Sequence, residues 1–326
     1  MIKIKKIGVL TSGGDAPGMN AAVRAVVRTG INNDIEVTGI ISGYKGLIDG
    51  DFRQMDTTSV SNIIQRGGTI LKTARSKKFK TKEGMEIAFQ NIKKQGIDAL
   101  ILIGGDGTFT GAYEFGNIYD FPIIGLPGTI DNDLYGTDFT IGYDTAINTV
   151  VDAADKIRDT AYSHDRLFII EVMGRDAGFI ALRAGIAAGA EDILIPETIT
   201  YIDDLLHKLE HDWRKNKTSG IIIVSEGDDS GGAFEVVKKI NEKFDYFKTR
   251  VTILGHIQRG GSPSCMDRVL ASTLGYEAVK ALLKGKRGVM VGKVHKDIVF
   301  TPFEKAIKHN QEINKSLLEM ARVLSL

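Results

Sequence analysis

At 326 residues the chain is long enough for two domains, and a composition of 43% hydrophobic and 25% charged residues is typical of a globular protein with a large core. The net charge of +1 gives no overall attraction for nucleic acid, and the single cysteine, Cys265, excludes an intrachain disulfide and a cysteine-built metal site. No apolar stretch is long enough to span a membrane, and the lysine-rich start followed by a short apolar run predicts a strand rather than a signal peptide. These features favour a cytoplasmic protein.

A strand, a glycine turn and a helix recur along the chain. The first strand is predicted at residues 7–11, its turn at 12–18, and a helix begins near Met19. The same patterns predict strands at 36–41, 99–103, 121–126, 167–172, 193–195, 221–224 and 251–254, and helices at 82–95 and 145–159. Apolar strands that alternate with helices indicate parallel sheets covered on both faces. Gly142 and Gly255 are plausible crossing points between two lobes.

Two of the glycine turns are acidic. The turn 104–108, Gly-Gly-Asp-Gly-Thr, follows the strand 99–103, and the run 127–133, Pro-Gly-Thr-Ile-Asp-Asn-Asp, follows the strand 121–126. Ligands bind at the carboxyl ends of parallel strands, and Mg²⁺ takes one or two carboxylates together with phosphate oxygens. An isolated Asp-Asn-Asp would favour a turn or a helix cap instead. Two such turns at strand ends favour a site for magnesium and phosphate.

The turn 12–18 leads into a helix N-terminus, whose unpaired N–H groups attract anions. Glycines of this kind also serve plain turns, so this turn alone leaves both interpretations open. The chain has no G-x-x-x-x-G-K-[ST] motif and no convincing G-x-G-x-x-G after a strand. If the segment after Ile130 is extended, Asp131 and Asp133 point to the same side. One could hold metal while the other accepts a proton from a substrate hydroxyl, as phosphoryl transfer requires.

Five motifs together resemble the bacterial-type ATP-dependent 6-phosphofructokinase family, and the resemblance covers essentially the whole chain from Lys5. They are GVLTSGGDAPGMNAA at 8–22, GGDGT at 104–108, PGTIDND at 127–133, EVMGR at 171–175 and LGHIQRGGSP at 254–263. The GGDGT turn alone is shared with NAD kinases and lipid kinases, whereas all five in this order are specific.

The resemblance implies transfer of a phosphoryl group from MgATP to the 1-hydroxyl of D-fructose 6-phosphate, giving fructose 1,6-bisphosphate and ADP, the committed step of glycolysis. Asp131 would be the base, Thr129 and Arg175 would contact the transferred group, and Asp106, supported by Asp133, would hold Mg²⁺. The expected ATP-binding residues are Gly14, Tyr44, Arg75, Ser76, Asp106, Gly107 and Thr108. The expected substrate-binding residues are Thr129, Ile130, Asp131, Arg166, Met173, Gly174, Arg175, Glu226, Arg250, His256, Ile257, Gln258 and Arg259.

The implied fold is α/β, with two Rossmann-like three-layer αβα lobes, mainly parallel sheets, and the active site in the cleft between the lobes. Residues 1–142 and 255–308 would form the larger, ATP-binding lobe, and residues 143–254 and 309–326 the smaller, fructose-6-phosphate-binding lobe. Arg166 and Arg250 match arginines that the family supplies from a neighbouring subunit to the 6-phosphate, beside His256 and Arg259. A homotetramer is therefore implied.

Two glycines bear on the phosphoryl donor. Relatives that use pyrophosphate have aspartate after Asp106 and lysine before Thr129, whereas this chain has Gly107 and Gly128, so ATP is predicted. A site for ADP or phosphoenolpyruvate as effector is expected at Arg24, Arg28, Arg158, Glu191, Lys215 and Lys217. Thr57, Asn62 and Ser219 differ from the residues common at that site, which predicts weakened or altered effector control.

Two alternative functions remain. A pyrophosphate-dependent enzyme is disfavoured by Gly107 and Gly128. A non-catalytic sensor of sugar phosphates or nucleotides would not require Asp106, Asp131 and Arg175 together. Neither a nucleic acid nor a membrane is expected as a partner.

Overall fold

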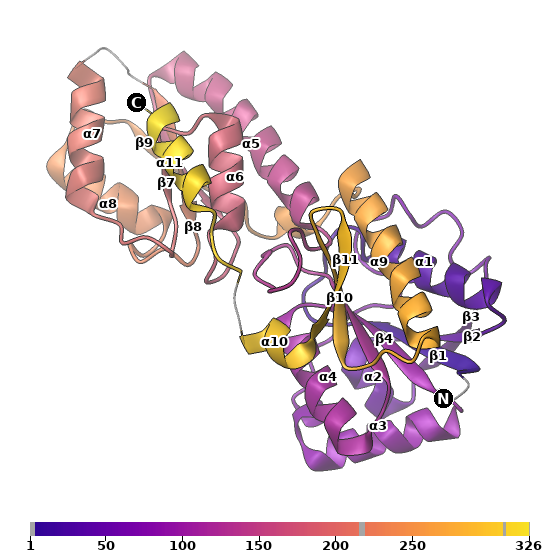
Figure 1. The fold of residues 1–326 in the computed structure, drawn as a ribbon. Coiled ribbons are helices and arrows are strands. Elements are labelled where there is room, and N and C mark those ends of the chain that lie inside the picture. The colour runs from indigo at the N-terminus through magenta and orange to yellow at the C-terminus, as the bar shows by residue number, and fades with distance from the viewer. Residues whose placement is uncertain (1–3, 215–218, 309–310, 326) are drawn as a thin grey trace. The chain divides into compact units, whose positions relative to one another are not determined.

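The computed structural model describes residues 4–214, 219–308 and 311–325, which form two compact units (Figure 1). So far as these ranges are described, unit 1 comprises Met1–Ile130, Leu134–Thr145 and Arg259–Gln311. Unit 2 comprises Asp131–Asp133, Ala146–Gln258 and Glu312–Leu326. No helix in the described part of the chain is long and apolar enough to cross a membrane.

Unit 1 is built on a sheet whose strand order, within the described residues, is β11-β10-β5-β4-β1-β2-β3. Its strands are β1 (Lys6–Thr11), β2 (Glu36–Ile40), β3 (Phe52–Met55), β4 (Ala99–Gly104), β5 (Ile123–Pro127), β10 (Val289–Val294) and β11 (Asp297–Pro302). Its helices are α1 (Met19–Asn32), α2 (Gly43–Asp49), the 3₁₀ turn η1 (Lys78–Lys80), α3 (Lys82–Lys94), α4 (Asp106–Tyr119), α9 (Cys265–Leu283) and α10 (Phe303–Lys308). The inner strands are parallel, whereas β3 and β11 pair antiparallel at the two edges.

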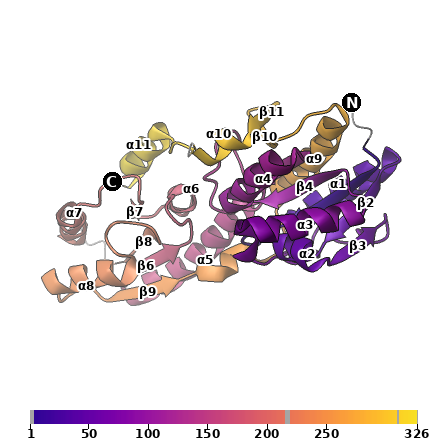
Figure 2. The ribbon, with the colours of Figure 1, turned by 90° about the horizontal axis from the view of Figure 1, so that it is seen from below.

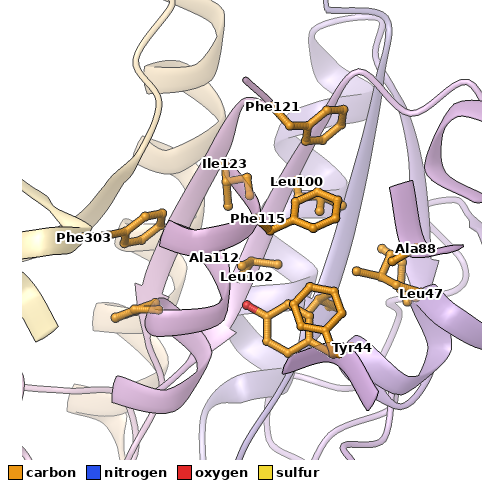
Figure 3. Packing of buried hydrophobic residues seen from close by; sticks show 14 of the residues in the cluster. Tyr44, Leu47, Ala88, Leu100, Leu102, Ala112, Phe115, Phe121, Ile123 and Phe303 are labelled. Carbon is orange, nitrogen blue, oxygen red and sulfur yellow. The ribbon is translucent and has the colours of Figure 1, made fainter. Parts of the chain in front are cut away.

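The helices of unit 1 lie in two layers on the sheet. Leu100 and Leu102 of β4 point into a core formed with α2, α3, α4 and α10, in which Tyr44, Phe115 and Phe303 are buried (Figure 3). Helices α1 and α9 pack together on the other side, and Figure 2 shows α3 and α9 on opposite sides of β4. Residues that alternate along a strand face opposite sides, so a continuously apolar strand such as β4 is required between the two layers.

Unit 2 has a smaller, entirely parallel sheet in the order β7-β8-β6-β9, counted over the residues described. Its strands are β6 (Leu167–Val172), β7 (Asp192–Leu194), β8 (Gly220–Ser225) and β9 (Thr249–Ile253). Its helices are α6 (Phe179–Ala188), α7 (Ile202–Arg214), α8 (Ala233–Lys243) and α11 (Lys315–Leu324), together with most of α5 (Tyr143–His164), and the 3₁₀ turn η2 (Gly255–Arg259) follows β9. Leu194 packs with α7 and α8, whereas the neighbouring Ile193 lies against Gly185 of α6, so helices cover both faces of this sheet as well.

The structure confirms the predicted fold class, with mainly parallel sheets and helices on both faces of each. The strand before the acidic run begins at Ile123 rather than at residue 121. Pro122 has no N–H group to donate, and its carbonyl oxygen accepts the N–H of Leu100 just before the strand starts. The antiparallel strands β3 and β11 had no counterpart in the predicted elements.

Candidate active site

Three neighbouring strands bring the predicted turns of unit 1 to one edge of the sheet. Strand β4 pairs with β1 on one side and β5 on the other, and Gly104 is the partner of Pro127. The N–H of Gly128 donates to the carbonyl oxygen of Gly104 over 3.0 Å, and that of Ser12 to Ile103 over 3.0 Å. The turns after β1, β4 and β5 are therefore adjacent, as the sequence predicted for the two acidic ones.

The start of α4 is shaped around a close backbone approach. A Cβ atom at Gly104 would lie 2.3 Å from Oγ1 of Thr108 and 2.5 Å from the carbonyl oxygen of Ser12, so only glycine fits. The buried Thr108 hydroxyl donates to that carbonyl over 3.1 Å and joins the turns after β1 and β4. Asp106 and Gly107 are exposed in the first helical turn, where N–H groups are unpaired and anions are favoured.

Gly107 and Gly128, which are expected to bear on the phosphoryl donor, differ in their surroundings. A Cβ atom at Gly107 would meet nothing within 4 Å. At Gly128 it would lie 2.9 Å from Ile103 and 3.2 Å from Met19 in the core. A side chain at position 107 is therefore tolerated by the protein and would act on a ligand, whereas one at position 128 would displace core atoms.

Thr129 is held by the segment that leads into α5. The hydroxyl of the fully buried Thr140 donates to the carbonyl oxygen of Thr129 over 2.6 Å, and the N–H of Ile141 donates to Pro127 over 2.8 Å. Gly142 and Thr145 donate their N–H groups to the carboxylate of Asp267, each over 2.8 Å. Burial raises the pKa of the fully buried Asp267 carboxyl, and these hydrogen bonds act in the opposite direction.

Three predicted ATP-binding residues lie at the α2–η1 side of unit 1. Tyr44 is buried, stacks on Phe79 with ring centroids 4.0 Å apart, and donates its hydroxyl to the carbonyl oxygen of Thr108. Burial raises the pKa of this hydroxyl, and the charge of Glu114 adds to the shift. Arg75 is exposed, and Ser76 accepts the N–H of Phe79. Tyr44 thus supports α4 from the core, and its contact with ATP stays a prediction.

Arg259 lies against the first glycine turn. Its Nη1 atom donates to the carbonyl oxygen of Asp15 over 3.3 Å and is 2.5 Å from the place that a Cβ atom at Gly14 would take. A residue expected at the sugar phosphate and one expected at ATP are therefore in contact within unit 1.

In unit 2, the proposed base has a cationic neighbour. Oδ2 of Asp131 lies 3.3 Å from Nε of Arg175, and the side chain of Asp131 is only 2% exposed whereas that of Arg175 is 50% exposed. The backbone of Asn132 has φ 54°, a left-handed conformation that asparagine tolerates better than most residues. The carboxylate of Asp131 and the guanidinium of Arg175 are therefore neighbours, and their roles in the reaction stay predictions.

The loop after β6 holds three predicted substrate contacts, Met173, Gly174 and Arg175. The N–H of Met173 donates to Oε1 of Gln258 over 3.2 Å. The next two N–H groups both donate to Oε1 of Glu226, over 3.2 and 2.8 Å. Glu226 is exposed, so its carboxylate can still face a ligand, whereas Gln258 is fully buried.

Arg166 and Arg250 lie at the other end of the same sheet. Arg166 directly precedes β6, and Arg250 pairs with Phe168 near the start of β9. Met173 follows the far end of β6, about 20 Å away at 3.3 Å per residue. The two arginines therefore cannot serve the same loop within one protomer. His256 and Ile257 are exposed in η2, at the Met173 end of the sheet.

The predicted effector residues fall in both units. Arg24 and Arg28 are one turn apart on α1, and partial burial together with the charge of Arg28 lowers the pKa of Arg24. Arg158 donates to the carbonyl oxygens of Ala188 and Gly189 at the end of α6, close in the chain to Glu191. Lys215 and Lys217 lie outside the described residues.

The described residues contain no cluster of three or more His, Cys, Asp or Glu side chains that could hold a metal ion by themselves. Asp106 is nevertheless an exposed carboxylate at a strand end beside two phosphate-compatible turns. This donor set fits Mg²⁺ that arrives with a nucleotide, because Mg²⁺ takes few protein ligands and completes its shell with phosphate oxygens and water.

Comparison with known proteins decides between the kinds of protein that this geometry allows. Residues 6–282 match the family model described as phosphofructokinase. The chain belongs to the phosphofructokinase family. It is 55% identical over 323 residues to "ATP-dependent 6-phosphofructokinase 2" of Bacteroides thetaiotaomicron, with 99% of each chain covered. It is 53% identical over 323 residues to "ATP-dependent 6-phosphofructokinase 1" of Thermus thermophilus, covering 99% of this chain and 100% of the relative. The resemblance inferred from the five motifs is confirmed, and the chain is an enzyme of the kinase class.

Solved structures of this family share the fold. Phosphofructokinase from Saccharomyces cerevisiae superposes with a TM-score of 0.88 at 39% identity, covering 98% of this chain and 47% of the yeast chain. A pyrophosphate-dependent phosphofructokinase from Marinobacter aquaeolei superposes with a TM-score of 0.85 at 21% identity, covering 98% of this chain and 91% of the other. The fold is thus common to enzymes with both donors and does not distinguish between them.

Sequence reasoning missed the supporting residues Thr140 and Asp267. Neither lies in a strand-end motif, and each acts through the backbone of residues distant in the chain. The only sequence signals were a threonine two residues before Gly142 and an aspartate at a helix start, which are too common to single them out.

Proposed function

We propose that this phosphofructokinase transfers the terminal phosphoryl group of ATP to the 1-hydroxyl of fructose 6-phosphate. The observation that carries the proposal is the buried carboxylate of Asp131 beside Arg175 on a strand-end motif. A carboxylate so placed is suited to orient a hydroxyl and accept its proton, while the guanidinium meets the negative charge of the transferred group. The two relatives described above are both named as ATP-dependent.

Unit 1 supplies the proposed ATP side. The turns after β1, β4 and β5 present glycine backbone and the N-terminus of α4, which suit phosphate oxygens. Asp106, supported by Asp133, would hold Mg²⁺, which when bound with ATP supplies neutralisation of the phosphate charge. Thr129, fixed through its carbonyl oxygen by Thr140, would contact the transferred group.

Unit 2 supplies the proposed sugar side. Glu226 would accept hydrogen bonds from sugar hydroxyls, and the loop of Met173 and Gly174 would lie along the sugar. His256, Ile257 and Arg259 would lie near the 6-phosphate, completed by Arg166 and Arg250 of a neighbouring subunit in a homotetramer. Both arginines lie at the end of the sheet opposite Met173, and this location supports their assignment to the site of a neighbouring subunit. A cytoplasmic location is part of the proposal, because ATP and the sugar phosphate would both be available there.

ATP is the proposed donor because Gly107 leaves open space where a pyrophosphate-using relative carries an aspartate. The effector site for ADP or phosphoenolpyruvate is proposed at Arg24, Arg28, Arg158 and Glu191, with Lys215 and Lys217. The exposed Thr57 replaces a common arginine there and removes a charged hydrogen bond worth about 1.5–3 kcal/mol. Effector control is therefore proposed to be weak, and strong ADP activation of a sigmoidal rate curve would contradict it.

The direct experiment measures fructose 1,6-bisphosphate formed by the purified protein with ATP or with pyrophosphate, beside the Asp131→Asn variant. We expect product with ATP and a fall of about 10²–10⁴-fold in kcat for the variant, with sugar-phosphate binding retained. Equal or faster turnover with pyrophosphate would overturn the donor. If both proteins are inactive while both bind the ligands, the chain is a sensor rather than a kinase.

A further inference from the structure

Gln258 is a fully buried amide whose two ends are both bound to backbone. Its Oε1 atom accepts the N–H of Met173 over 3.2 Å, and its Nε2 atom donates to the carbonyl oxygen of Gly255 over 3.0 Å. Gly255 opens the turn η2 after β9, and Met173 opens the loop after β6, two strands that pair directly. The side chain therefore joins two neighbouring strand-end loops and has no exposed surface to offer a ligand.

The loop that Gln258 holds has an unusual backbone. Arg175 has φ 53°, in the left-handed region that residues other than glycine rarely adopt, and Gly174 before it has φ 151°. All three successive N–H groups of residues 173, 174 and 175 donate to side-chain oxygens, one to Gln258 and two to Glu226. A sparsely populated backbone conformation persists only where its surroundings fix it, and such conformations cluster at functional sites.

The geometry has a consequence for the guanidinium. Arg175 is 50% exposed, so few packing contacts constrain its side chain, and its direction depends on the backbone from which it leaves. That backbone places Nε of Arg175 3.3 Å from Oδ2 of Asp131. Glu226 anchors the loop at one side and also faces solvent, whereas Gln258 anchors it from the interior.

We propose that Gln258 is a positioning residue for the phosphoryl transfer, which sets the Met173–Arg175 loop and through it the approach of Arg175 to Asp131. The proposal rests on the proposed function and assigns Gln258 a role through the backbone rather than a contact with the sugar. Two side chains that bind this loop would then have different roles. Glu226 would bind both the loop and the sugar, whereas Gln258 would bind the loop alone.

The test replaces one atom, the side-chain amide nitrogen of Gln258, with oxygen. Gln258→Glu keeps an oxygen for the N–H of Met173, but its ionised carboxylate cannot donate to Gly255 and would face that carbonyl oxygen instead. We expect kcat/KM for fructose 6-phosphate to fall about 10–100-fold near pH 8, because small misplacements of a positioned group have effects of this size. The KM for ATP should stay within about twofold, because the ATP-binding residues do not depend on this loop.

Lowering the pH should rescue this variant. The introduced carboxyl group donates to Gly255 when protonated, and burial favours the protonated form. Glu226, His256 and Asp131 are ionisable groups in wild type and variant alike, so the readout is the ratio of variant to wild-type kcat/KM. That ratio should rise as the pH falls from about 8 to about 6. If Gln258 had a purely structural role, Gln258→Glu would lower the melting temperature, and protonation of the new carboxyl group at low pH would not restore kcat/KM.

Two further variants complete the test. Asn91→Asp is the matched control, because Asn91 also donates its amide to backbone carbonyl oxygens, those of Leu47 and Ile48, and all three residues belong to unit 1. It should leave the sugar-phosphate kcat/KM within about twofold of wild type. Gln258→Leu removes both hydrogen bonds and should lose activity at every pH. If wild type makes product and Gln258→Leu matches its kcat/KM, the inference is overturned. If wild type makes no product, it is the proposed function that fails.

Discussion

Arg175 and Asp131 form an ion pair, 3.3 Å between Nε and Oδ2, between an exposed guanidinium and a carboxylate that is almost wholly buried. The two residues lie more than 40 positions apart in the sequence and both belong to unit 2. A buried carboxylate requires a compensating charge or hydrogen bonds, and here one partner is a residue proposed to contact the transferred phosphoryl group.

This pair predicts that arginine at position 175 is needed for geometry as well as charge. Arg175→Lys keeps the positive charge but loses the planar guanidinium that can contact Asp131 and a phosphoryl oxygen together. We expect kcat to fall by about 10²-fold or more, with a smaller change in the KM for ATP. Steady-state kinetics with each substrate varied in turn measures the split. A lysine variant with wild-type kcat would show that charge alone suffices.

Gly107 predicts a change in nucleotide use without loss of fold. Because a Cβ atom there would meet nothing within 4 Å, Gly107→Asp should melt within a few degrees of wild type. Its carboxylate would repel the α-phosphate of ATP, so the KM for ATP should rise about tenfold or more. Gly128→Lys is the contrasting variant, since its side chain would collide with Ile103 and Met19 and should lower the melting temperature strongly. Unchanged ATP kinetics in Gly107→Asp would count against ATP phosphates at the start of α4.

If Arg166 serves the active site of a neighbouring subunit, oligomers that mix two poorly active variants should recover activity. Arg166→Ala and Asp131→Asn should each be poorly active alone. When the two are co-expressed, a site with an intact Asp131 receives an intact Arg166 from its neighbour. About one quarter of wild-type activity is then expected for random mixing, because half of the subunits supply each intact residue. If each arginine served its own protomer, no site in the mixture would be complete and no recovery would be seen.

Asp267 predicts a pH dependence of stability. Burial raises its pKa above the ordinary 3.8, so the folded state holds this proton more tightly than the unfolded state. The stabilisation from the protonated form is therefore present below the unfolded pKa and is lost as the pH rises through the raised value. Asp267→Asn has no such proton. The free energy of unfolding of wild type minus that of the variant, from urea titrations, should decrease as the pH rises from about 4 to about 7. An increase over this range would contradict the raised pKa.

The strand-end motifs were predictable because each combines an apolar strand with a turn whose residue types have a physical reason. The neighbouring positions of the turns after β4 and β5, and the parallel arrangement, followed from that pattern alone. The antiparallel strand β11 was not found, because its six residues show no alternation of buried and exposed positions. The roles of Thr140 and Gln258 depend on carbonyl and N–H groups that folding brings together, and local sequence patterns do not indicate such contacts.

The pairing of β10 with β5 also constrains how the chain can fold during synthesis. Val289 and Met290 are the partners of Ile124 and Gly125. The inner strand β5 therefore cannot pair on this side until a segment about 165 residues further along the chain has been synthesised. All four strands of the smaller sheet lie between these two partners in the chain. Unit 2 can thus assemble its sheet on the ribosome while β5 still has an open edge, and pairing so distant in sequence is slow. An unpaired inner strand is prone to associate with other chains, so aggregation should be greatest for nascent chains that end between β9 and β10.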